Sequence, residues 1–216
     1  MDVPLELTME EARVLGALSE KDMATPEYYP MSLNALTNAC NQKTNRDPVT
    51  AFDDVTVRDA LHLLRDRGLA VFVSEAGSRV EKYRHKLAEK FNFTRGEQAI
   101  LTVLMLRGPQ TAAELRERTS RMAPLDDLET VSHTLEKLAA REPDPLARLL
   151  PRAPGTKEPR WAHLLCGEPD FHVHPEPEHA GPPSSGLQER VSQLEREISQ
   201  LRAEFESLRS KIDPLL

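Results

Sequence analysis

The pattern of apolar and polar positions that opens the chain occurs a second time about 86 residues later. In residues 7–18 and 93–104, a threonine is followed three residues later by a glutamate, which is the capping-box signature of a helix start. Apolar side chains then follow at helical spacing: Val14, Leu15 and Leu18 in the first segment, and Ile100, Leu101 and Leu104 in the second. The pattern predicts an internal repeat whose copies begin with the same buried helix.

Two more helices are expected in each copy. Ser32 and Thr111 carry the hydroxyl groups that suit the N-cap of a second helix. A third helix is indicated by apolar residues three and four positions apart, which form one buried stripe: Val57, Leu61 and Leu64 in the first copy, and Val131, Leu135 and Leu138 in the second.

A strand, a turn with glycine and a second strand are expected after each third helix. The strands cover residues 69–73 and 79–87 in the first copy, and 146–150 and 157–165 in the second. Three helices closed by a hairpin with a basic tip are the plan of a winged helix-turn-helix domain. We therefore predict a mainly α fold with small β-hairpin wings (α+β), with tandem winged-helix domains over 1–88 and 89–166.

The last quarter of the chain has a different composition. Residues 167–186 are rich in proline, histidine and acidic groups, which is typical of a semi-rigid linker. Residues 187–213 predict a coiled-coil helix, because apolar residues alternate in steps of four and three along one seam: Leu187, Val191, Leu194, Ile198, Leu201, Phe205, Leu208 and Ile212.

The charges beside this seam predict a parallel homodimer. In a parallel pair, each g residue meets the e residue five positions later on the partner. The three pairs are all attractive: Arg190 with Glu195, Glu197 with Arg202, and Glu204 with Arg209. The alternative is an amphipathic helix that folds back on its own domains, which would not need these complementary charges.

Composition narrows the class of protein. The 216 residues include 39% hydrophobic and 29% charged residues, and no apolar run approaches the roughly 20 residues that span a bilayer. The N-terminus lacks a signal-peptide pattern, and the two cysteines form neither a disulfide framework nor a CxxC pair. We expect a cytoplasmic protein with no membrane contact. The net charge of −7 weighs against a general nucleic-acid coat protein.

The stretch from Cys40 to Val49 resembles the YceH-like family of bacterial proteins, a domain of unknown function. Further residues support the resemblance: Glu20-Lys21, Thr25-Pro26-Glu27, Ser32-Leu33-Asn34, Leu106 to Thr111, and Glu114-Leu115-Arg116. The resemblance implies a tandem winged-helix fold and a bacterial cytoplasmic protein, but it brings no established activity.

Eight residues of the first copy are candidates for contact with nucleic acid. They lie in the loop before the third helix, on one face of that helix and in the wing: Lys43, Asn45, Arg46, Arg58, His62, Arg65, Arg79 and Lys82. For the loop, the alternative is that its polar residues hold an irregular backbone through local hydrogen bonds. For the helix, the alternative is a solvated face of mixed charge.

Catalytic chemistry is not expected. The sequence has no glycine-rich phosphate loop, no HExxH and no nucleophile elbow, and the histidines of the linker sit in a segment that is poorly suited to fix metal geometry. His85 and His163 occupy equivalent strand positions, which favours structural roles. We therefore predict no enzyme, cofactor or metal, and a DNA-binding or transcription-regulatory dimer. The alternative is a scaffold whose winged helices dock proteins in a chromosome- or transcription-associated assembly.

Overall fold

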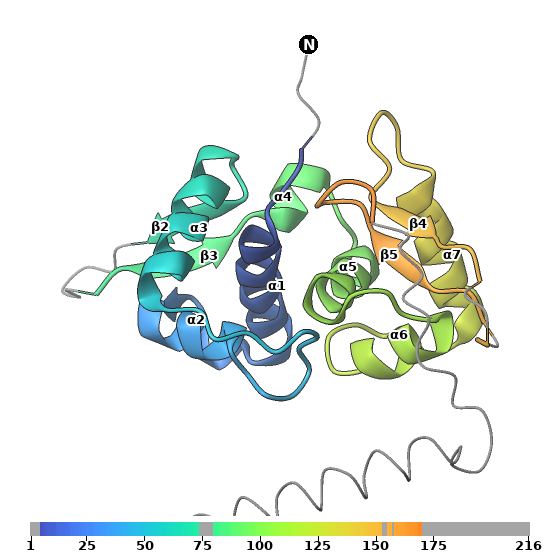
Figure 1. Cartoon of the computed structure of the whole chain (residues 1–216), viewed down its shortest axis with the longest axis horizontal. Coiled ribbons are helices and arrows are strands. Elements are labelled where there is room, and N and C mark those ends of the chain that lie inside the picture. The colour runs from blue at the N-terminus through green and yellow to red at the C-terminus, as the bar shows by residue number, and fades with distance from the viewer. Residues whose placement is uncertain (1–4, 74–79, 153–154, 157, 170–216) are drawn as a thin grey trace, which may run out of the picture. The chain divides into compact units, whose positions relative to one another are not determined.

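The computed structural model describes residues 5–73, 80–152, 155, 156 and 158–169 (Figure 1). All the described residues belong to one compact unit, Met1–His172. The heptad segment 187–213, nearly all of the expected linker and Arg79 lie outside the described residues. None of the described helices is long and apolar enough to cross a membrane.

The first half of the unit follows the predicted order of helices and strands. Its elements are α1 (Met9–Ala24), the 3-10 turn η1 (Pro26–Tyr28), β1 (Met31–Ser32), α2 (Leu33–Cys40), α3 (Asp54–Asp66), β2 (Ala70–Val73) and β3 (Lys82–His85). The strands form an antiparallel sheet in the order β1-β3-β2. The short helix α4 (Leu87–Phe91) then leads into the second half.

The second half repeats this order with α5 (Arg95–Arg107), α6 (Ala112–Thr119), α7 (Leu128–Ala139), β4 (Ala147–Leu149) and β5 (Trp161–His163). Strands β4 and β5 are antiparallel, and Gln110 forms a bridge with Trp161 where the first half has β1 beside β3. The mixed α+β class with small antiparallel sheets is thus confirmed.

The predicted helix starts are confirmed. Thr8 with Glu11 and Thr94 with Glu97 form complete capping boxes, while Ser32 and Thr111 cap α2 and α6. The caps of the third helices were not predicted. They are two aspartates whose side chains accept a backbone hydrogen bond at the helix start, Asp53 for α3 and Asp127 for α7.

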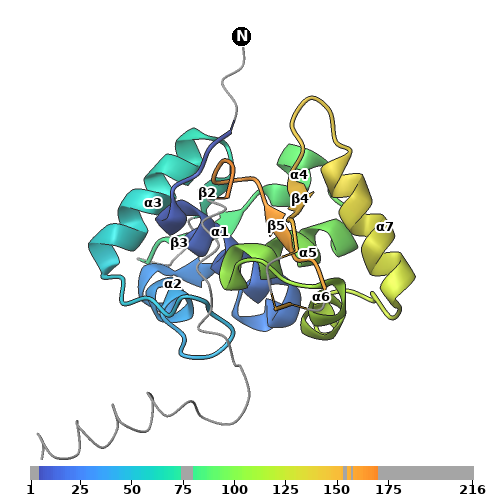
Figure 2. The ribbon, with the colours of Figure 1, turned by 45° about the vertical axis from the view of Figure 1, so that its right-hand side comes forward.

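The two halves pack against each other through α1 and α5, which lie side by side in both views (Figures 1 and 2). The contacts are reciprocal. The Ser19 hydroxyl lies 2.7 Å from the Thr102 hydroxyl, and a Cβ on Gly16 would lie 3.2 Å from the Cβ of Met105. Gly16 and Thr102 are equivalent repeat positions, as are Ser19 and Met105. Each contact is therefore the counterpart of the other across an approximate two-fold axis.

Further hydrogen bonds fasten the halves. The Leu7 amide donates to the Leu165 carbonyl at 2.7 Å, and the Asp47 amide donates to the Leu106 carbonyl at 2.9 Å. The buried apolar residues of both halves also form one continuous core. The two predicted copies are therefore parts of a single compact unit.

Candidate nucleic-acid interface

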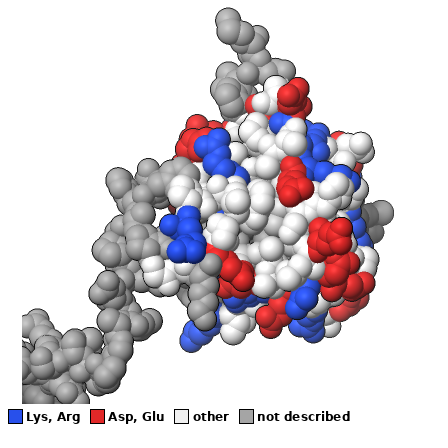
Figure 3. All heavy atoms as spheres, turned by 90° about the vertical axis from the view of Figure 1, so that its right-hand side faces the viewer, with Lys and Arg blue, Asp and Glu red and all other residues white. Residues whose placement is uncertain are grey.

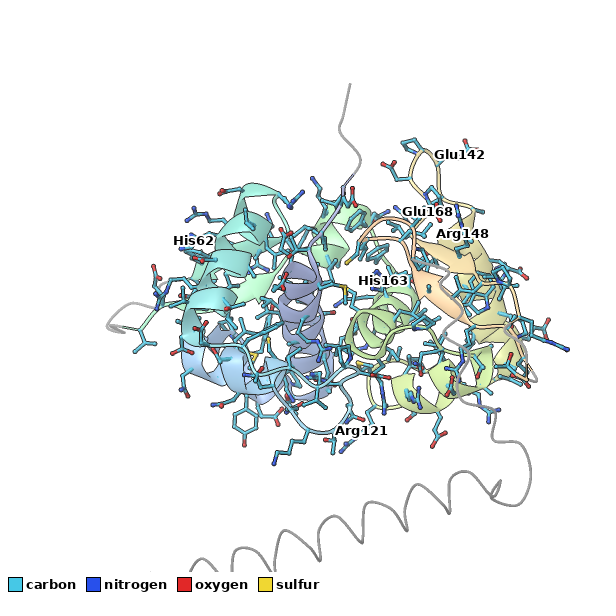
Figure 4. The ribbon with its side chains drawn as sticks, viewed as in Figure 1. His62, Arg121, Glu142, Arg148, His163 and Glu168 are labelled. Carbon is cyan, nitrogen blue, oxygen red and sulfur yellow. The ribbon has the colours of Figure 1, made fainter. Side chains whose placement is uncertain are left out.

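The candidate surface begins with the outer side of α3. Val57, Leu61 and Leu64 are fully buried, so the rotation of the helix about its axis is fixed. This leaves Arg58 and Arg65 exposed and His62 partly exposed, and Figure 4 shows His62 at the outer side of α3. We call these three residues the α3 face. Arg58 has no hydrogen-bond or ion-pair partner among the described residues.

Phe72, on strand β2 of the hairpin, contacts two residues of this face. The guanidinium carbon of Arg65 lies 4.8 Å from the centroid of the Phe72 ring, and the His62 ring meets the same ring edge-on at 5.3 Å. Phe72 is directly opposite Tyr83 in the β2–β3 register, and their rings make an edge contact at 5.0 Å. The aromatic pair therefore links the hairpin to two of the three residues of the α3 face.

Carboxylates lie on the same helix, and most of them already have local partners. The backbone amide of Thr56 donates to Asp53, and this hydrogen bond holds the pKa of that carboxyl below its usual value. Asp54 accepts a 2.6 Å hydrogen bond from the Thr37 hydroxyl of α2. Asp66 lies beside Arg65, with 3.4 Å from the guanidinium to its carboxylate oxygen. The surface therefore has mixed charge.

Arg46 does not belong to the exposed surface. Its side chain has no solvent-exposed area and forms an ion pair with Glu20 at 2.6 Å. It also donates to the carbonyls of Ala39 and Asn45 at 3.0 and 2.8 Å. Burial and these bonds leave Arg46 unable to reach a nucleic acid, so we remove it from the candidate set. Its donors instead hold the loop backbone in place.

The other two candidates in the loop, Asn45 and Lys43, are exposed, but the loop contacts the second half of the unit. Asn45 has a positive φ of 60° and accepts a 3.1 Å hydrogen bond from Arg107 at the end of α5. Lys43 is exposed. The loop between α2 and α3 therefore connects the two halves, because Asp47 also bonds to the end of α5.

The wing contributes less described surface than expected. Lys82 begins β3, is partly exposed and pairs in register with Val73. Arg84 forms an ion pair with Glu89 of α4 at 3.2 Å. Arg79, at the predicted wing tip, lies outside the described residues. The structure thus brings together Arg58, His62 and Arg65, with Lys82 on the adjoining hairpin.

Sequence reasoning missed the role of Phe72. The signal was present, because the predicted turn around Gly77 places Phe72 opposite Tyr83 if the hairpin is paired symmetrically about the turn. The contact with α3 was not predictable from the pairing alone, since it depends on how the hairpin packs against the helix.

The equivalent surface of the second half has different chemistry. Ser132, Glu136 and Ala139 of α7 stand where Arg58, His62 and Arg65 stand on α3. Leu149 replaces Phe72, faces Trp161 in register and is 45% exposed. Figure 3, which views this side of the molecule, shows acidic and basic side chains scattered around a largely uncharged centre.

The two repeat-related histidines also differ in their surroundings. The ring of His85 accepts a hydrogen bond from the Leu87 amide at 3.1 Å and contacts Asp22 at 3.2 Å. His163 lies on β5, and its buried Nδ1 has no hydrogen-bond partner among the described residues (Figure 4). Burial lowers the pKa of His163 to about 4.

Neither cysteine has the lowered pKa of an activated thiol. Burial raises the pKa of Cys40 to about 12 and that of Cys166 to about 11, so both are protonated thiols at neutral pH. Within the described ranges, no group of three or more histidine, cysteine or acidic residues is placed to hold a metal ion.

Comparisons with known proteins find relatives along most of the chain. A family model described as "Protein of unknown function, DUF480" matches residues 7–156. A UPF0502 protein of Citrifermentans bemidjiense is 56% identical over 169 residues, which cover 77% of this chain and 78% of the relative. A UPF0502 protein of Geobacter sulfurreducens is 51% identical over 189 residues, with 85% and 84% covered. One of Opitutus terrae is 51% identical over 179 residues, with 82% and 78% covered.

Proposed function

The chain belongs to the DUF480/UPF0502 family of uncharacterised bacterial proteins, and we propose that it is a DNA-binding regulatory protein whose first half contacts the duplex. Each half is a winged helix in this proposal, with α3 as the recognition helix and the β2–β3 hairpin as the wing. The finer resemblance to YceH-like proteins agrees with this fold. The second half serves mainly to brace the first.

The observation that carries the proposal is the α3 face. It places two exposed arginines and a histidine on the outer side of one helix, next to a hairpin that bears Lys82. Arginine and histidine side chains on a helix of this kind suit base edges and phosphates in the major groove. Since α7 has no arginine and carries only His133 and Lys137 as basic side chains, DNA contact is assigned to the first half.

The C-terminal segment completes the proposal. If residues 187–213 form a parallel coiled coil, a dimer carries two α3 faces and suits a site with two-fold symmetry. This part rests on the heptad seam and its charge pairs.

A binding assay on the full chain tests the proposal. Fluorescence anisotropy with labelled fragments of bacterial genomic DNA should reveal binding that weakens as salt rises. Arg58→Ala should raise Kd by about 5- to 150-fold on a preferred sequence, which corresponds to about 1 to 3 kcal/mol. Lys137→Ala, on the exposed side of α7, is the matched control and should leave Kd nearly unchanged. Binding that survives both Arg58→Ala and Arg65→Ala would overturn the assignment.

Protein docking is the second candidate function. Val55 and Leu63 of α3 are 56% and 46% exposed, and the net charge of the chain is −7. Both features suit a protein partner better than a polyanion. Crosslinking that recovers DNA and proteins from the same cells separates the two. Discrete genomic loci support DNA binding, and a stoichiometric protein without loci supports docking.

A further inference from the structure

We propose that Arg65 binds a backbone phosphate and that Phe72 is the positioning residue that holds its guanidinium for this contact. The inference deepens the DNA-binding function proposed above and rests on it. It assigns a ligand chemistry to one residue of the α3 face, and it gives the β2 strand a part in recognition.

The stacking geometry is the first step. The guanidinium carbon of Arg65 lies over the Phe72 ring, 4.8 Å from its centroid. A guanidinium that stacks in this way keeps its N–H edges available for an oxygen acceptor. The side chain remains 46% exposed, so these edges are accessible to a ligand. Stacking also restricts the long side chain before binding, which reduces the ordering that binding requires.

The place of Arg65 in the fold selects phosphate over a base edge. Arg65 is in the last turn of α3, and its carbonyl accepts from the Gly68 amide in the turn that leads to β2. It therefore lies where helix and hairpin meet. Arg58 is seven residues earlier, about 10 Å along the helix, and is the better candidate for a base in the groove. Contacts at the junction with a wing typically go to the backbone.

The contact with Asp66 shows that Arg65 can donate to an anionic oxygen. Both Nε and Nη2 of Arg65 lie 3.4 Å from the same carboxylate oxygen of Asp66. These distances are long for a charge-assisted bond, and Asp66 is 68% exposed. A phosphate oxygen that approaches the same two donors can displace this weak surface pair.

The second half supplies an internal contrast. Ala139 stands at the position of Arg65, and Leu149 stands at the position of Phe72. The cation and the ring that supports it are therefore absent together from the second half. This joint absence is expected if the contact that Arg65 makes depends on Phe72.

The first test separates phosphate from base contact. Affinity of the full chain is measured on several duplexes of different sequence over a range of salt. Arg65→Ala should weaken binding by about the same factor on every duplex and lower the slope of log K against log salt by about 0.9. A change of sequence preference with an unchanged slope would overturn the phosphate assignment.

The second test concerns Phe72 and Asp66. Phe72→Leu should weaken binding about 3- to 10-fold, and Phe72→Tyr, which keeps the ring, should restore it. Arg65→Lys keeps the charge at an exposed position and should also weaken binding, because it loses the planar stack. Asp66→Asn should tighten binding more than Asp59→Asn, which removes an equal charge from the same helix. Equal effects of these two asparagine variants would show that Asp66 does not compete with phosphate for Arg65.

A third readout works without DNA. The Arg65 Nε–H signal in an NMR spectrum should carry a ring-current shift that Phe72→Leu abolishes and Phe72→Tyr retains. If the wild type binds no duplex, the proposed function fails, whereas this signal still decides whether Phe72 positions Arg65. If the chemical shift is unchanged in a folded Phe72→Leu variant, Phe72 does not position Arg65.

Discussion

The two halves of the described unit use the same framework and different surfaces. Phe72 faces Tyr83 across the first hairpin as Leu149 faces Trp161 across the second. The buried leucines of α3 and α7 also correspond. Only in the first half of the described unit, however, is the residue on the outer strand an aromatic ring, and the guanidinium of Arg65 lies over that ring. Packing therefore fixes the framework, while the candidate chemistry depends on a few differences between surface residues.

The histidines extend the contrast into the interior. His85 has partners in Leu87 and Asp22, whereas the inner nitrogen of His163 has none among the described residues. One equivalent position therefore stabilises a polar network, and the other carries a partly buried ring whose buried Nδ1 has no partner among the described residues and that burial holds neutral.

The largest expected effect decides whether the molecule carries one α3 face or two. Replacing Leu194 and Leu201 with glutamine should weaken dimerisation by about 4 kcal/mol or more, because each buried leucine contributes about 2 to 5 kcal/mol. Sedimentation at several concentrations should then find a folded monomer. Ser199→Gln and Ala203→Gln, outside the seam, are the matched controls. A wild type that is monomeric at tens of micromolar contradicts the coiled-coil prediction.

The next prediction asks whether the halves are stable separately. Leu61→Ala and Leu135→Ala remove equivalent, fully buried side chains and should each cost about 2 to 5 kcal/mol of unfolding free energy. Trp161, the sole tryptophan, reports on the second half. Because α1 and α5 join the halves, Leu61→Ala should also shift the Trp161 fluorescence transition in urea. A transition that stays in place for Leu61→Ala but moves for Leu135→Ala would mean that the halves unfold independently.

A smaller effect is expected from the two histidines. The pKa of His163 falls from the usual 6.5 to about 4 on folding, so the unfolded chain takes up a proton at a higher pH than the folded chain does. The stability from His163 is therefore complete above about pH 6.5 and is lost as the pH falls towards 4. The loss is on the order of 2 kcal/mol, since one pKa unit corresponds to about 1.4 kcal/mol and the ring is not fully sequestered.

His163→Phe should flatten this part of the stability curve when urea unfolding is followed between pH 7 and about pH 4. His85→Phe is the comparison, because it removes hydrogen bonds to Leu87 and Asp22 and should lower stability at neutral pH as well. A His163→Phe variant with the same acid dependence as the wild type would show that this histidine does not cause it.

The smallest expected effect tests whether the C-terminal helices of the dimer are parallel or antiparallel. In a parallel pair, Glu197→Lys faces Arg202 of the other chain and should weaken the dimer by a few tenths of a kcal/mol, more at low salt. In an antiparallel pair centred on Leu201, the same lysine would face Glu204 and strengthen the dimer. The sign of the change in dimer Kd, measured by sedimentation, therefore decides the orientation.

Much of the framework was predictable because it depends on local signals. The threonine caps, the buried stripes of α3 and α7 and both hairpins follow from spacing and residue type within about a dozen positions. The sequence did not reveal that Arg46 is buried, because its partner Glu20 lies 26 residues away on α1. The loop could therefore be interpreted as a DNA contact, because the sequence alone does not show whether an arginine is exposed or is buried in an ion pair.

The union of the halves was also beyond local reasoning. The match between residues 7–18 and 93–104 revealed two copies, but it did not reveal that their first helices meet. That contact depends on Gly16, which allows Met105 and Leu106 to approach closely, and on the hydrogen bond between Ser19 and Thr102. A glycine or a serine on a helix does not predict such a contact unless its partner residue is also known.

The reciprocal contact between α1 and α5 has the geometry of a symmetric homodimer interface enclosed within one polypeptide. In a homodimer, every mutation appears on both sides of the axis at once. Within a single chain, each side changes alone, so glycine at position 16 can face a helix that carries threonine at the equivalent position 102. The same freedom lets one outer helix carry arginines at positions where the other has serine and alanine, so that the two copies can differ in surface chemistry while their first helices stay in contact.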